Sequence, residues 1–566
     1  MPSLVLEDFM GGRNTLEAVN NIKNNQSGDV ENFWAEKRAL VKRSGFSKTT
    51  VSINSLSPIP EQLRATALAS GSTLRLMQIS RVAAHSQRYM VYTDDGTTFA
   101  WAGYTVGTFT TADGTTITGS GANAWLQNVA VGDYFIKSGG TPTRVSAVDT
   151  NTQIRVTDSQ GVIGGATAYT IIPAIAQGSP CAMCLFDVSS AQNLFLADGS
   201  RAYRYDGTNV YRVDGSGGYS MPTNKLLAVH KNYVFSFSST AAQWCALKDI
   251  TSWPAANTQT ITRVDDPIRG VAVYNDSIVI FTRSRMFRLI GDVFDPSNPS
   301  YRVEQISTPP EFNFYFSRTP VVHEGTLKFL AADGWYSYPG GTEIEKISQG
   351  IQPDVDGFRR LAFSAEAMQD SAVAYVYKGR LWCSVPDDAE SPAQTVNTIY
   401  VLDERGAWWK WPTAAADADG SITDFAYTRF GTTGSYQLKG GSASTAAVMT
   451  MDSGVADDAG AIDGVWRSKE FILPDEVEFI EMLVDIKKQS SGSLTLGFSV
   501  DRNTEVTNSV AMTGGSAAAG GIIRRRVPIA RVGKAIRLSV RNNTATDSVE
   551  VYRIECVFAK SEGYRV

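Results

Sequence analysis

The sequence predicts an all-β protein built around a six- or seven-bladed β-propeller, on the basis of its composition and of recurring hairpin motifs. The chain of 566 residues contains 49 Gly, 22 Tyr, 25 Phe and 11 Trp. Aromatic and β-branched side chains favour strands, and glycine favours the tight turns between them. A chain of this length exceeds what one hydrophobic core usually supports, so we expect several domains.

A hairpin motif recurs four times in the middle of the chain. Each copy places His or Tyr before two turn-forming residues and a new apolar strand, and the marking residues are His230, Tyr274, His323 and Tyr377. Their separations of 44, 49 and 54 residues are close to the period of about 40–50 residues of a four-stranded blade. Because a single small sheet leaves its apolar faces exposed, such blades are stable only when they stack and close into a ring.

A second repeat supports the first. Residues 194–199 end in Asp198-Gly199 and residues 329–334 end in Asp333-Gly334, and aromatic residues follow both pairs. An Asp-Gly pair supplies the positive φ angles of a tight hairpin turn. These segments are therefore interpreted as further blade hairpins.

The rest of the chain divides around the propeller, which we assign to residues 61–104 and 173–455. Residues 105–172 are rich in Gly and Thr and predict a small β-barrel or sandwich inserted into a blade loop, where insertions cost little closure entropy. Residues 456–566 predict a carboxy-terminal antiparallel β-sandwich. Residues 1–60 form an N-terminal arm or extended segment, in which 16–25 and 30–42 are short helices or extended arms.

The charge and cysteine content of the chain limit the kinds of partner and cofactor that we expect. The formal net charge of −5 gives no overall basic footprint for wrapping nucleic acid. Five cysteines are too few for a disulfide framework, and the pair Cys181 and Cys184 lacks a second pair to complete a zinc site, so we expect no metal and no cofactor. With neither a signal sequence nor an apolar stretch of about 18 residues, we expect a chain made in the cytosol without a membrane segment.

Candidate catalytic groups have simpler structural interpretations. Propeller glycosidases place carboxylates in the central mouth of the ring, but Asp198 and Asp333 lie in turns. Asp265 and Asp266 are adjacent on an extended chain, so their side chains point to opposite faces. The histidines mark the repeat better than they mark the base of a nucleophile. We therefore expect no catalytic residues and no enzymatic activity.

Basic and aromatic clusters remain as candidate contacts. Lys42 and Arg43, and a second cluster at Arg524, Arg525 and Arg526, are interpreted either as charges that protect sheet edges or as contacts with an acidic partner subunit. A third interpretation is that these basic residues make a weak contact with DNA in transit. The aromatic run 408–411 is expected to pack between blades, with an exposed carbohydrate-binding shelf as the alternative.

Three parts of the sequence resemble a known family. Gly11-Gly12-Arg13-Asn14, followed by Asp29-Val30-Glu31-Asn32 and Leu40-Val41-Lys42-Arg43-Ser44-Gly45-Phe46, is similar to the opening of phage tail tubular (nozzle) and tail hub proteins. The stretch 247–254, with 265–270 and 279–282 after it, resembles a segment of propeller-type phage tail proteins. The inserted block 105–172 is also similar to a small β-module that such proteins carry.

The resemblance implies a structural subunit of the virion tail, synthesised in the host cytoplasm. It implies a homo-oligomeric ring, commonly a hexamer, below the portal and adaptor, which forms a conduit for DNA ejection and a docking platform for tail fibre or tip proteins. DNA would pass through the lumen transiently and without sequence specificity. The alternatives are a receptor- or glycan-binding tail-tip protein and, as a third reading, a secreted propeller glycosidase.

Overall fold

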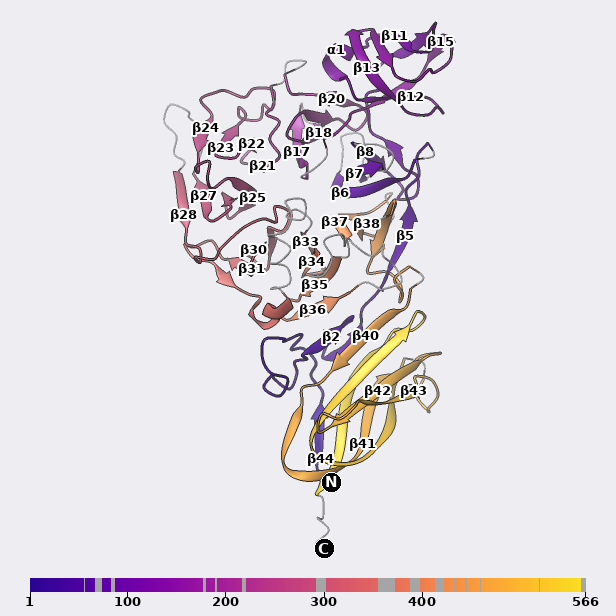
Figure 1. Cartoon of the computed structure of the whole chain (residues 1–566), viewed down its shortest axis with the longest axis vertical. Coiled ribbons are helices and arrows are strands. Elements are labelled where there is room, and N and C mark those ends of the chain that lie inside the picture. Colours follow the sequence, from indigo (N-terminus) through magenta and orange to yellow (C-terminus); the bar gives the residue numbers. More distant parts are fainter. Residues whose placement is uncertain are drawn as a thin grey trace.

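The computed structural model describes residues 1–560 except 55, 67–73, 83–86, 177–179, 189–190, 216–219, 292–301, 355–371, 387–396, 413–421, 431–433, 443–444, 459 and 519. The chain forms three bodies along its longest axis (Figure 1). A small curled sheet lies at one end, a ring of sheets lies in the middle, and a large sheet lies at the other end beside both termini. In the described part of the chain, none of the helices has the length and apolar character needed to span a bilayer.

In the part of the chain that the structure describes, the ring consists of seven four-stranded units, here called blades 1 to 7. Six of them are separate sheets, and the remaining one, blade 6, is the end of a 14-stranded sheet. Blades 1 to 3 comprise β6 (Pro58–Thr66), β7 (Arg75–Val82), β8 (Arg88–Thr93) and β9 (Ala100–Trp101); β17 (Ala182–Val188), β18 (Ala191–Ala197), β19 (Ala202–Tyr205) and β20 (Val210–Arg212); and β21 (Leu227–His230), β22 (Tyr233–Phe237), β23 (Ala241–Trp244) and β24 (Thr258–Thr260).

The other four blades complete the circle. They comprise β25 (Ile268–Tyr274), β26 (Ser277–Thr282), β27 (Met286–Ile290) and β28 (Arg302–Ile306); β29 (Val321–His323), β30 (Thr326–Ala331), β31 (Gly334–Tyr338) and β32 (Glu345–Lys346), followed by η1 (Gln349–Ile351); β33 (Val373–Tyr377), β34 (Arg380–Pro386), β35 (Asn397–Leu402) and β36 (Trp408–Trp411); and β37 (Ile422–Thr428), β38 (Gln437–Ser442), β39 (Ala447–Met451) and β5 (Phe46–Thr50). This arrangement confirms the predicted all-β propeller.

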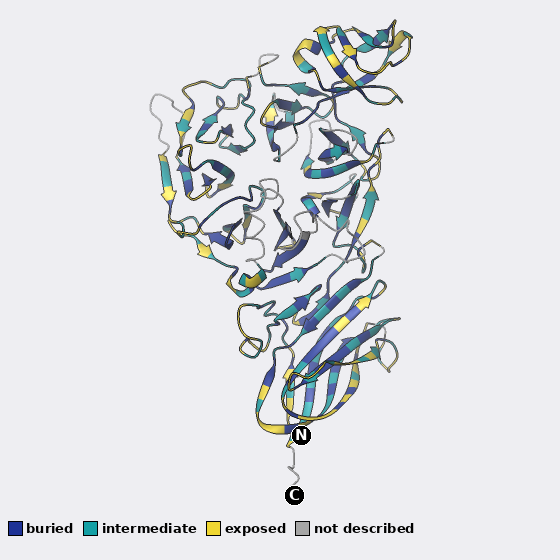
Figure 2. Cartoon of the chain, in the orientation of Figure 1, coloured by how far each residue is buried: buried dark blue, intermediate teal, exposed yellow. Residues whose placement is uncertain are grey.

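The first strand of each blade faces the middle of the ring. The neighbouring pairs β17 and β21, β21 and β25, β29 and β33, β33 and β37, and β37 and β6 lie side by side. Phe281 of blade 4 packs on Phe329 of blade 5 with 4.8 Å between ring centroids. Blades 1 and 2 are joined through Gln62, whose side-chain amide both donates to and accepts from the backbone of Cys181. Figure 2 shows buried residues in every blade, and the second strands β22 and β26 are buried along their whole length.

The N-terminal segment closes the ring. Strand β5 is the outermost strand of blade 7 and pairs with β39, with Phe46 opposite Met451 and Thr50 opposite Ala447. The chain then continues into β6, the innermost strand of blade 1. The last blade is therefore completed by residues from the start of the chain, so the first and last blades are linked covalently as well as by packing.

The predicted repeat hairpins are tight two-residue turns. Both central residues have positive φ in each copy, with values of 47° and 64° at Lys231 and Asn232, and 46° and 53° at Asn275 and Asp276. The other two turns have 50° and 72° at Glu324 and Gly325, and 50° and 71° at Lys378 and Gly379. Two successive positive φ angles define the type I′ turn, whose twist matches that of the flanking strands. The structure thus confirms these hairpins.

The His or Tyr that marks the repeat joins neighbouring blades. The Tyr274 hydroxyl of blade 4 donates to the Gly325 carbonyl in the turn of blade 5, at 2.6 Å. In the same way, His323 Nε2 donates to the Gly379 carbonyl in the turn of blade 6, at 2.9 Å. At the corresponding place in blade 3, Lys231 Nζ lies 2.8 Å from an Asp276 carboxylate oxygen of blade 4. The sequence repeat is therefore the mark of a repeated contact between blades.

The inserted body is a curled seven-stranded sheet in the order β15-β10-β11-β14-β13-β12-β16. Its two edge strands are separated in sequence only by Ala168, so the sheet must curve until its edges approach each other. A core around Phe109, Trp125, Phe135 and Tyr169 fills it. Its elements are β10 (Thr108–Thr111), β11 (Thr116–Ser120), α1 (Trp125–Asn128), β12 (Tyr134–Lys137), β13 (Thr143–Thr150), β14 (Gln153–Val156), β15 (Ile163–Thr167) and β16 (Tyr169–Ile172).

The carboxy-terminal body is one sheet folded over a common core. The first part of β44 pairs with β41, whereas its last part pairs with β42 and β40. Inward residues of both layers share one cluster that includes Met482, Phe498, Val527 and Leu538. Its strands are β40 (Ile462–Arg467), β41 (Phe471–Lys487), β42 (Ser493–Val500), β43 (Val506–Ala511), β44 (Ile522–Thr544) and β45 (Glu550–Lys560). The two layers expected of a sandwich thus belong to one hydrogen-bonded sheet.

N-terminal strands connect this body to the ring. The strands β1 (Ser3–Leu6), β2 (Asp29–Glu31), β3 (Phe33–Glu36) and β4 (Ala39–Lys42) all belong to the 14-stranded sheet. Strand β2 pairs with β36 of blade 6 on one side and with β40 on the other. Residues 30–42 thus form strands and not helices, and they carry hydrogen bonding from the propeller into the carboxy-terminal body.

We expect the contact between blades to contribute measurably to stability. Replacing Tyr274 by Phe removes the hydroxyl and leaves the Gly325 carbonyl without this donor, so the free energy of unfolding should fall by about 1 kcal/mol. Urea unfolding followed by tryptophan fluorescence measures the change. The control is Tyr436→Phe, because that side chain is 46 % exposed, and it should leave stability within about 0.5 kcal/mol. An equal effect of both substitutions would contradict the assigned role.

Candidate functional site

The middle of the propeller contains a cavity of about 730 Å³ that is lined by residues from all seven blades. The charged side chains of the lining are Arg64 on β6, Lys225 before β21, Arg269 on β25, Arg318 before β29 and Asp424 on β37. Four positive charges therefore face one negative charge among the lining residues that the structure describes. This channel is the candidate functional site.

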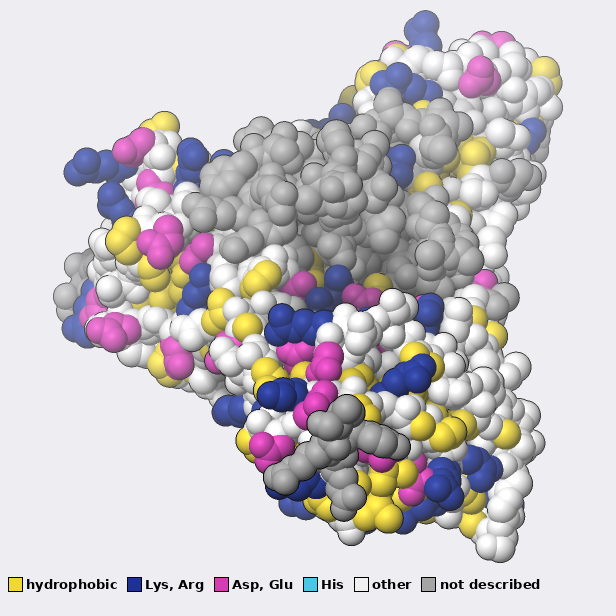
Figure 3. All heavy atoms as spheres, turned by 60° about the horizontal axis from the view of Figure 1, so that its bottom comes forward, with side chains coloured by type: hydrophobic (Ala, Val, Ile, Leu, Met, Phe, Trp, Pro, Cys, Tyr) yellow, Lys and Arg dark blue, Asp and Glu magenta, His cyan; other side chains and the backbone are white. Residues whose placement is uncertain are grey.

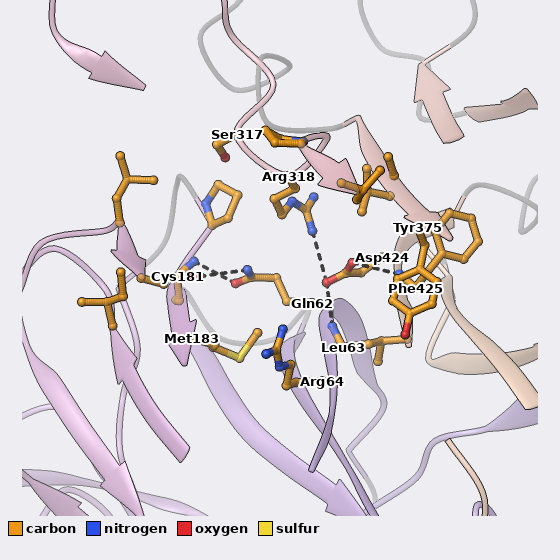
Figure 4. Close-up of a pocket in the computed structure, with 18 of the residues that line it drawn as sticks. Gln62, Leu63, Arg64, Cys181, Met183, Ser317, Arg318, Tyr375, Asp424 and Phe425 are labelled. Carbon is orange, nitrogen blue, oxygen red and sulfur yellow. Dashed lines mark hydrogen bonds and ion pairs between the residues drawn. The ribbon is translucent and has the colours of Figure 1, made fainter. Parts of the chain in front are cut away.

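Asp424 connects three blades through a hydrogen bond and an ion pair. Its Oδ2 accepts a hydrogen bond from the Leu63 backbone at 2.9 Å and lies 3.5 Å from Arg318 Nη1. Figure 4 shows Arg318 of blade 5 and Leu63 of blade 1 both directed at Asp424 of blade 7. Burial raises the pKa of Asp424, and the Arg318 guanidinium opposes that rise. The carboxylate thus accepts a hydrogen bond from a backbone amide of the inner strand β6 that would otherwise lack a partner.

A single acid limits the hydrolytic chemistry of the channel. Glycoside hydrolysis commonly uses two carboxyl groups about 5–10 Å apart on either side of the scissile bond. Within the described lining, Asp424 is the one carboxylic acid. The described lining residues of the cavity thus offer no such pair.

The other acids considered from the sequence stabilise turns. Asp198 accepts hydrogen bonds from the backbone amides of Ser200, Arg201 and Ala176. Asp333 accepts a 2.5 Å hydrogen bond from the Tyr336 hydroxyl.

The side chains of Asp265 and Asp266 lie in different environments, as expected for neighbours that point to opposite faces of the chain. Asp266 is buried and accepts hydrogen bonds from Thr282 Oγ1 and the Ser284 amide, whereas Asp265 is exposed. The two carboxylates do not share a site.

Histidine and cysteine residues occupy structural positions. His323 Nδ1 accepts a hydrogen bond from Lys328 Nζ at 2.9 Å, so both ring nitrogens are engaged. His85 lies outside the described residues. Cys181 and Cys184 are buried, and burial raises the pKa of each thiol to about 12. In the part of the chain that the structure describes, no group of three or more His, Cys, Asp or Glu side chains is arranged to hold a metal ion.

The tryptophans of β36 are packed inside the protein. Trp408, Trp409 and Trp411 are all buried. Trp408 donates to the Ile347 carbonyl at 3.0 Å and stacks near Trp335 of blade 5, with 5.8 Å between ring centroids. Trp408 therefore contacts the neighbouring blade, whereas Trp411 packs against Trp34 and Trp382. None of the three forms an exposed shelf.

Lys42 and Arg43, predicted as partner contacts, are internal residues of this chain. Lys42 Nζ donates to Asn542 Oδ1 at 2.6 Å and to the Thr544 carbonyl at 2.7 Å. Arg43 makes a bidentate pair with Asp457, and its Nε donates to Asn32 Oδ1. Because both side chains are buried and their donors are used within the chain, their charged groups are not available at the surface.

The second predicted cluster lies at the surface of the carboxy-terminal body. Arg524 pairs with Asp485 of the adjacent strand, and Arg526 pairs with Glu481. Arg525 donates to the carbonyls of Ala511 and Thr513. Figure 3 shows basic and acidic side chains interspersed over this body. The cluster therefore forms ladders of opposite charge across β41 and β44, and its outer face is accessible to a partner.

The cations of the channel were not singled out from the sequence, although a signal exists. Lys225, Arg269 and Arg318 each lie five residues before the His or Tyr that marks the hairpin of their blade, namely His230, Tyr274 and His323. The same period that identifies the blades thus places three cations at the same distance in sequence from the hairpin turns of blades 3, 4 and 5, on or just before the first strand of each blade.

Residues quoted for the family resemblance hold the N-terminal segment to the ring and to the chain ahead of β40. Gly12 has φ of 67°, and a Cβ atom there would lie 2.7 Å from the Trp408 carbonyl oxygen. Arg13 donates to Asp354 at 2.8 and 3.1 Å, and its amide donates to the Trp408 carbonyl. A Cβ atom at Gly45 would lie 1.7 Å from the Ala456 carbonyl oxygen. A side chain at Gly12 or Gly45 would therefore collide with the backbone of a distant segment.

Loss of the Arg43 side chain should destabilise this junction strongly. In Arg43→Met the Asp457 carboxylate stays buried without its partner, so the free energy of unfolding should fall by about 3–5 kcal/mol. Urea unfolding measures the effect. The matched control is Arg541→Met, which breaks an exposed pair with Asp463 and should cost less than about 1 kcal/mol. Similar losses in the two variants would contradict the internal role of Arg43.

Lys42 should make stability depend on alkaline pH. Burial, together with the nearby Arg43 charge, lowers the pKa of Lys42 from 10.5 to about 8. Between these values the unfolded chain holds a proton that the folded chain has released, so the free energy of unfolding should rise with pH across this window. The stability of the wild type relative to Lys42→Met should therefore increase from pH 7 to pH 10. Denaturant midpoints measure it, with the exposed Lys534→Met as control. A difference that stays constant with pH would disprove the expectation.

No family model matches the sequence, and no curated protein matches it with significance. Solved structures give distant matches. An exo-β-1,3-galactanase from Phanerochaete chrysosporium has 10% identity and a TM-score of 0.25, over 68% of this chain and 96% of that chain. A glycoside hydrolase family 43 arabinoxylan arabinofuranohydrolase from Bacillus subtilis has 9% identity and a TM-score of 0.20, over 89% of this chain and 96% of that chain.

The N-terminal domain of Nup159 has 12% identity and a TM-score of 0.25, over 48% of this chain and 91% of that chain. Identities and TM-scores this low transfer no activity, substrate or partner to the present chain. The comparisons therefore leave its function to be argued from its own residues.

Proposed function

We propose that the chain is a structural subunit of a bacteriophage tail, of the nozzle or hub type, that assembles into a ring around the path of DNA ejection. The observation that carries the proposal is the junction between the propeller and the carboxy-terminal body. The segment that resembles the opening of tail nozzle and hub proteins contains β2, which pairs with both bodies. In the same segment Gly12 and Arg13 contact the ring, and Arg43 and Gly45 contact residues 456–457 ahead of β40.

The junction suits a protein whose task is to hold other proteins in fixed positions. Strand β2 pairs with β36 of the ring and with β40 of the carboxy-terminal body, so one hydrogen-bonded sheet crosses the boundary. The Arg13–Asp354 and Arg43–Asp457 ion pairs lie beside this sheet. Inter-domain boundaries without such continuity are generally mobile. Here the two bodies are expected to move as one.

The shape of the chain suits a docking platform. The inserted body and the carboxy-terminal body project from opposite ends of the propeller (Figure 1). Each offers surfaces to other chains: neighbouring copies in a ring, the tail adaptor, and tail fibre or tip proteins. The proposed role needs no covalent chemistry, in keeping with the structural positions of Asp198, Asp333 and Asp424.

Ring assembly tests the proposal directly. Mass photometry of the purified protein should reveal an oligomer whose mass is a multiple of the 61.3 kDa chain, with six copies the expected number. Negative-stain imaging should then show rings with a central hole. A glycan array and a fluorogenic glycoside panel run on the same sample examine the two alternatives. A persistent monomer that binds glycans or cleaves glycosides would overturn the structural role.

The exposed arginine ladder is the predicted partner contact in this assembly. The double variant Arg524→Gln/Arg526→Gln should shift the mass distribution towards monomer by weakening the contact with an acidic partner surface. The matched control is Arg502→Gln, because Arg502 is also exposed and paired, in its case with Glu470. An unchanged oligomer in the double variant would remove this cluster from the interface.

A further inference from the structure

The cations of the propeller channel form a regular array. Lys225, Arg269 and Arg318 lie at the same distance in sequence from the hairpin turns of three consecutive blades, and Arg64 extends the set from blade 1. Arg64 is exposed to solvent although it lines the cavity. In Figure 4 it lies between Met183 and the Arg318–Asp424 pair. Three members of the array are thus placed by the repeat, and the fourth, Arg64, is accessible to a ligand.

The charge of the channel opposes that of the whole chain. Among its described lining residues, four cations stand against Asp424 alone, while the full chain has a formal net charge of −5. A recess lined by one sign of charge, between low-dielectric walls, focuses the electrostatic potential and concentrates ligands of opposite charge. The channel therefore attracts anions despite the acidic protein around it.

We propose that this channel binds a small anion that carries several phosphate groups. The cavity of about 730 Å³ falls within the range of about 300–1,000 Å³ that small-molecule sites occupy. Guanidinium groups bind phosphate oxygens through two parallel hydrogen bonds, and Lys225 adds a point charge. The excess of three positive charges matches a chain of phosphates better than a single carboxylate. This site belongs to one chain and does not depend on ring assembly.

Isothermal titration calorimetry with inorganic triphosphate at low salt tests the site. We expect saturable binding of one triphosphate per chain that weakens as salt is added. The variant Arg64→Gln/Lys225→Gln should weaken binding at least tenfold, since hydrogen bonds to charged groups contribute this much or more. The control Arg524→Gln/Arg526→Gln removes the same charge from the surface of another body and should bind as the wild type does. Circular dichroism and Tm establish that each variant is folded.

Four results would overturn the assignment. They are absence of saturable binding to the wild type, equal weakening in the surface control, equal affinity for citrate, and tighter binding of a short single-stranded oligonucleotide than of triphosphate. The citrate arm separates phosphate recognition from general attraction of anions. The oligonucleotide arm separates a small ligand from the backbone of a nucleic acid. If the double variant has a lowered Tm, the single variant Arg64→Gln, whose side chain is exposed, provides the same comparison.

Discussion

The whole structure depends on the burial of each blade against its two neighbours. A four-stranded sheet cannot cover both of its apolar faces alone, so every blade requires the next one. The inner strands meet around the channel, and the hairpin residues Tyr274 and His323 reach the turns of the following blades. Strand β5 removes the remaining gap by completing blade 7. The channel, the inserted body and the junction all take their positions from this closed ring.

The two proposals rest on different parts of the molecule. The tail role rests on the junction, where residues of the family resemblance connect ring and carboxy-terminal body through β2. The anion site rests on the channel, where the blade repeat brings cations together. A ligand that binds only the folded state stabilises that state. An anion bound in the channel would therefore offset the repulsion between the cations and stabilise the propeller of the docking protein.

Local patterns were enough to predict the blades, because each hairpin carries its turn residues and its spacing within about fifty residues of sequence. Contacts between distant segments could not be predicted in this way. Strand β5 pairs with a strand some 400 residues later, and Lys42 and Arg43 find Asn542 and Asp457 at similar separations. The positive charge of Lys42 and Arg43 predicted a place at the surface, whereas the fold buries both side chains beside polar partners. The cluster of cations in the channel was not predicted from the sequence, because these residues become neighbours only when the ring closes.

The pairing of β5 with β39 has a consequence for synthesis on the ribosome. The strand that completes blade 7, residues 46–50, leaves the ribosome about 400 residues before its partner, residues 447–451. Until then β5 is an open edge with unpaired backbone groups, the kind of edge that recruits strands from other chains. A nascent chain is therefore exposed to wrong pairing while the residues between β5 and β39 are made, and a chaperone that shields β5 would raise the yield of folded protein.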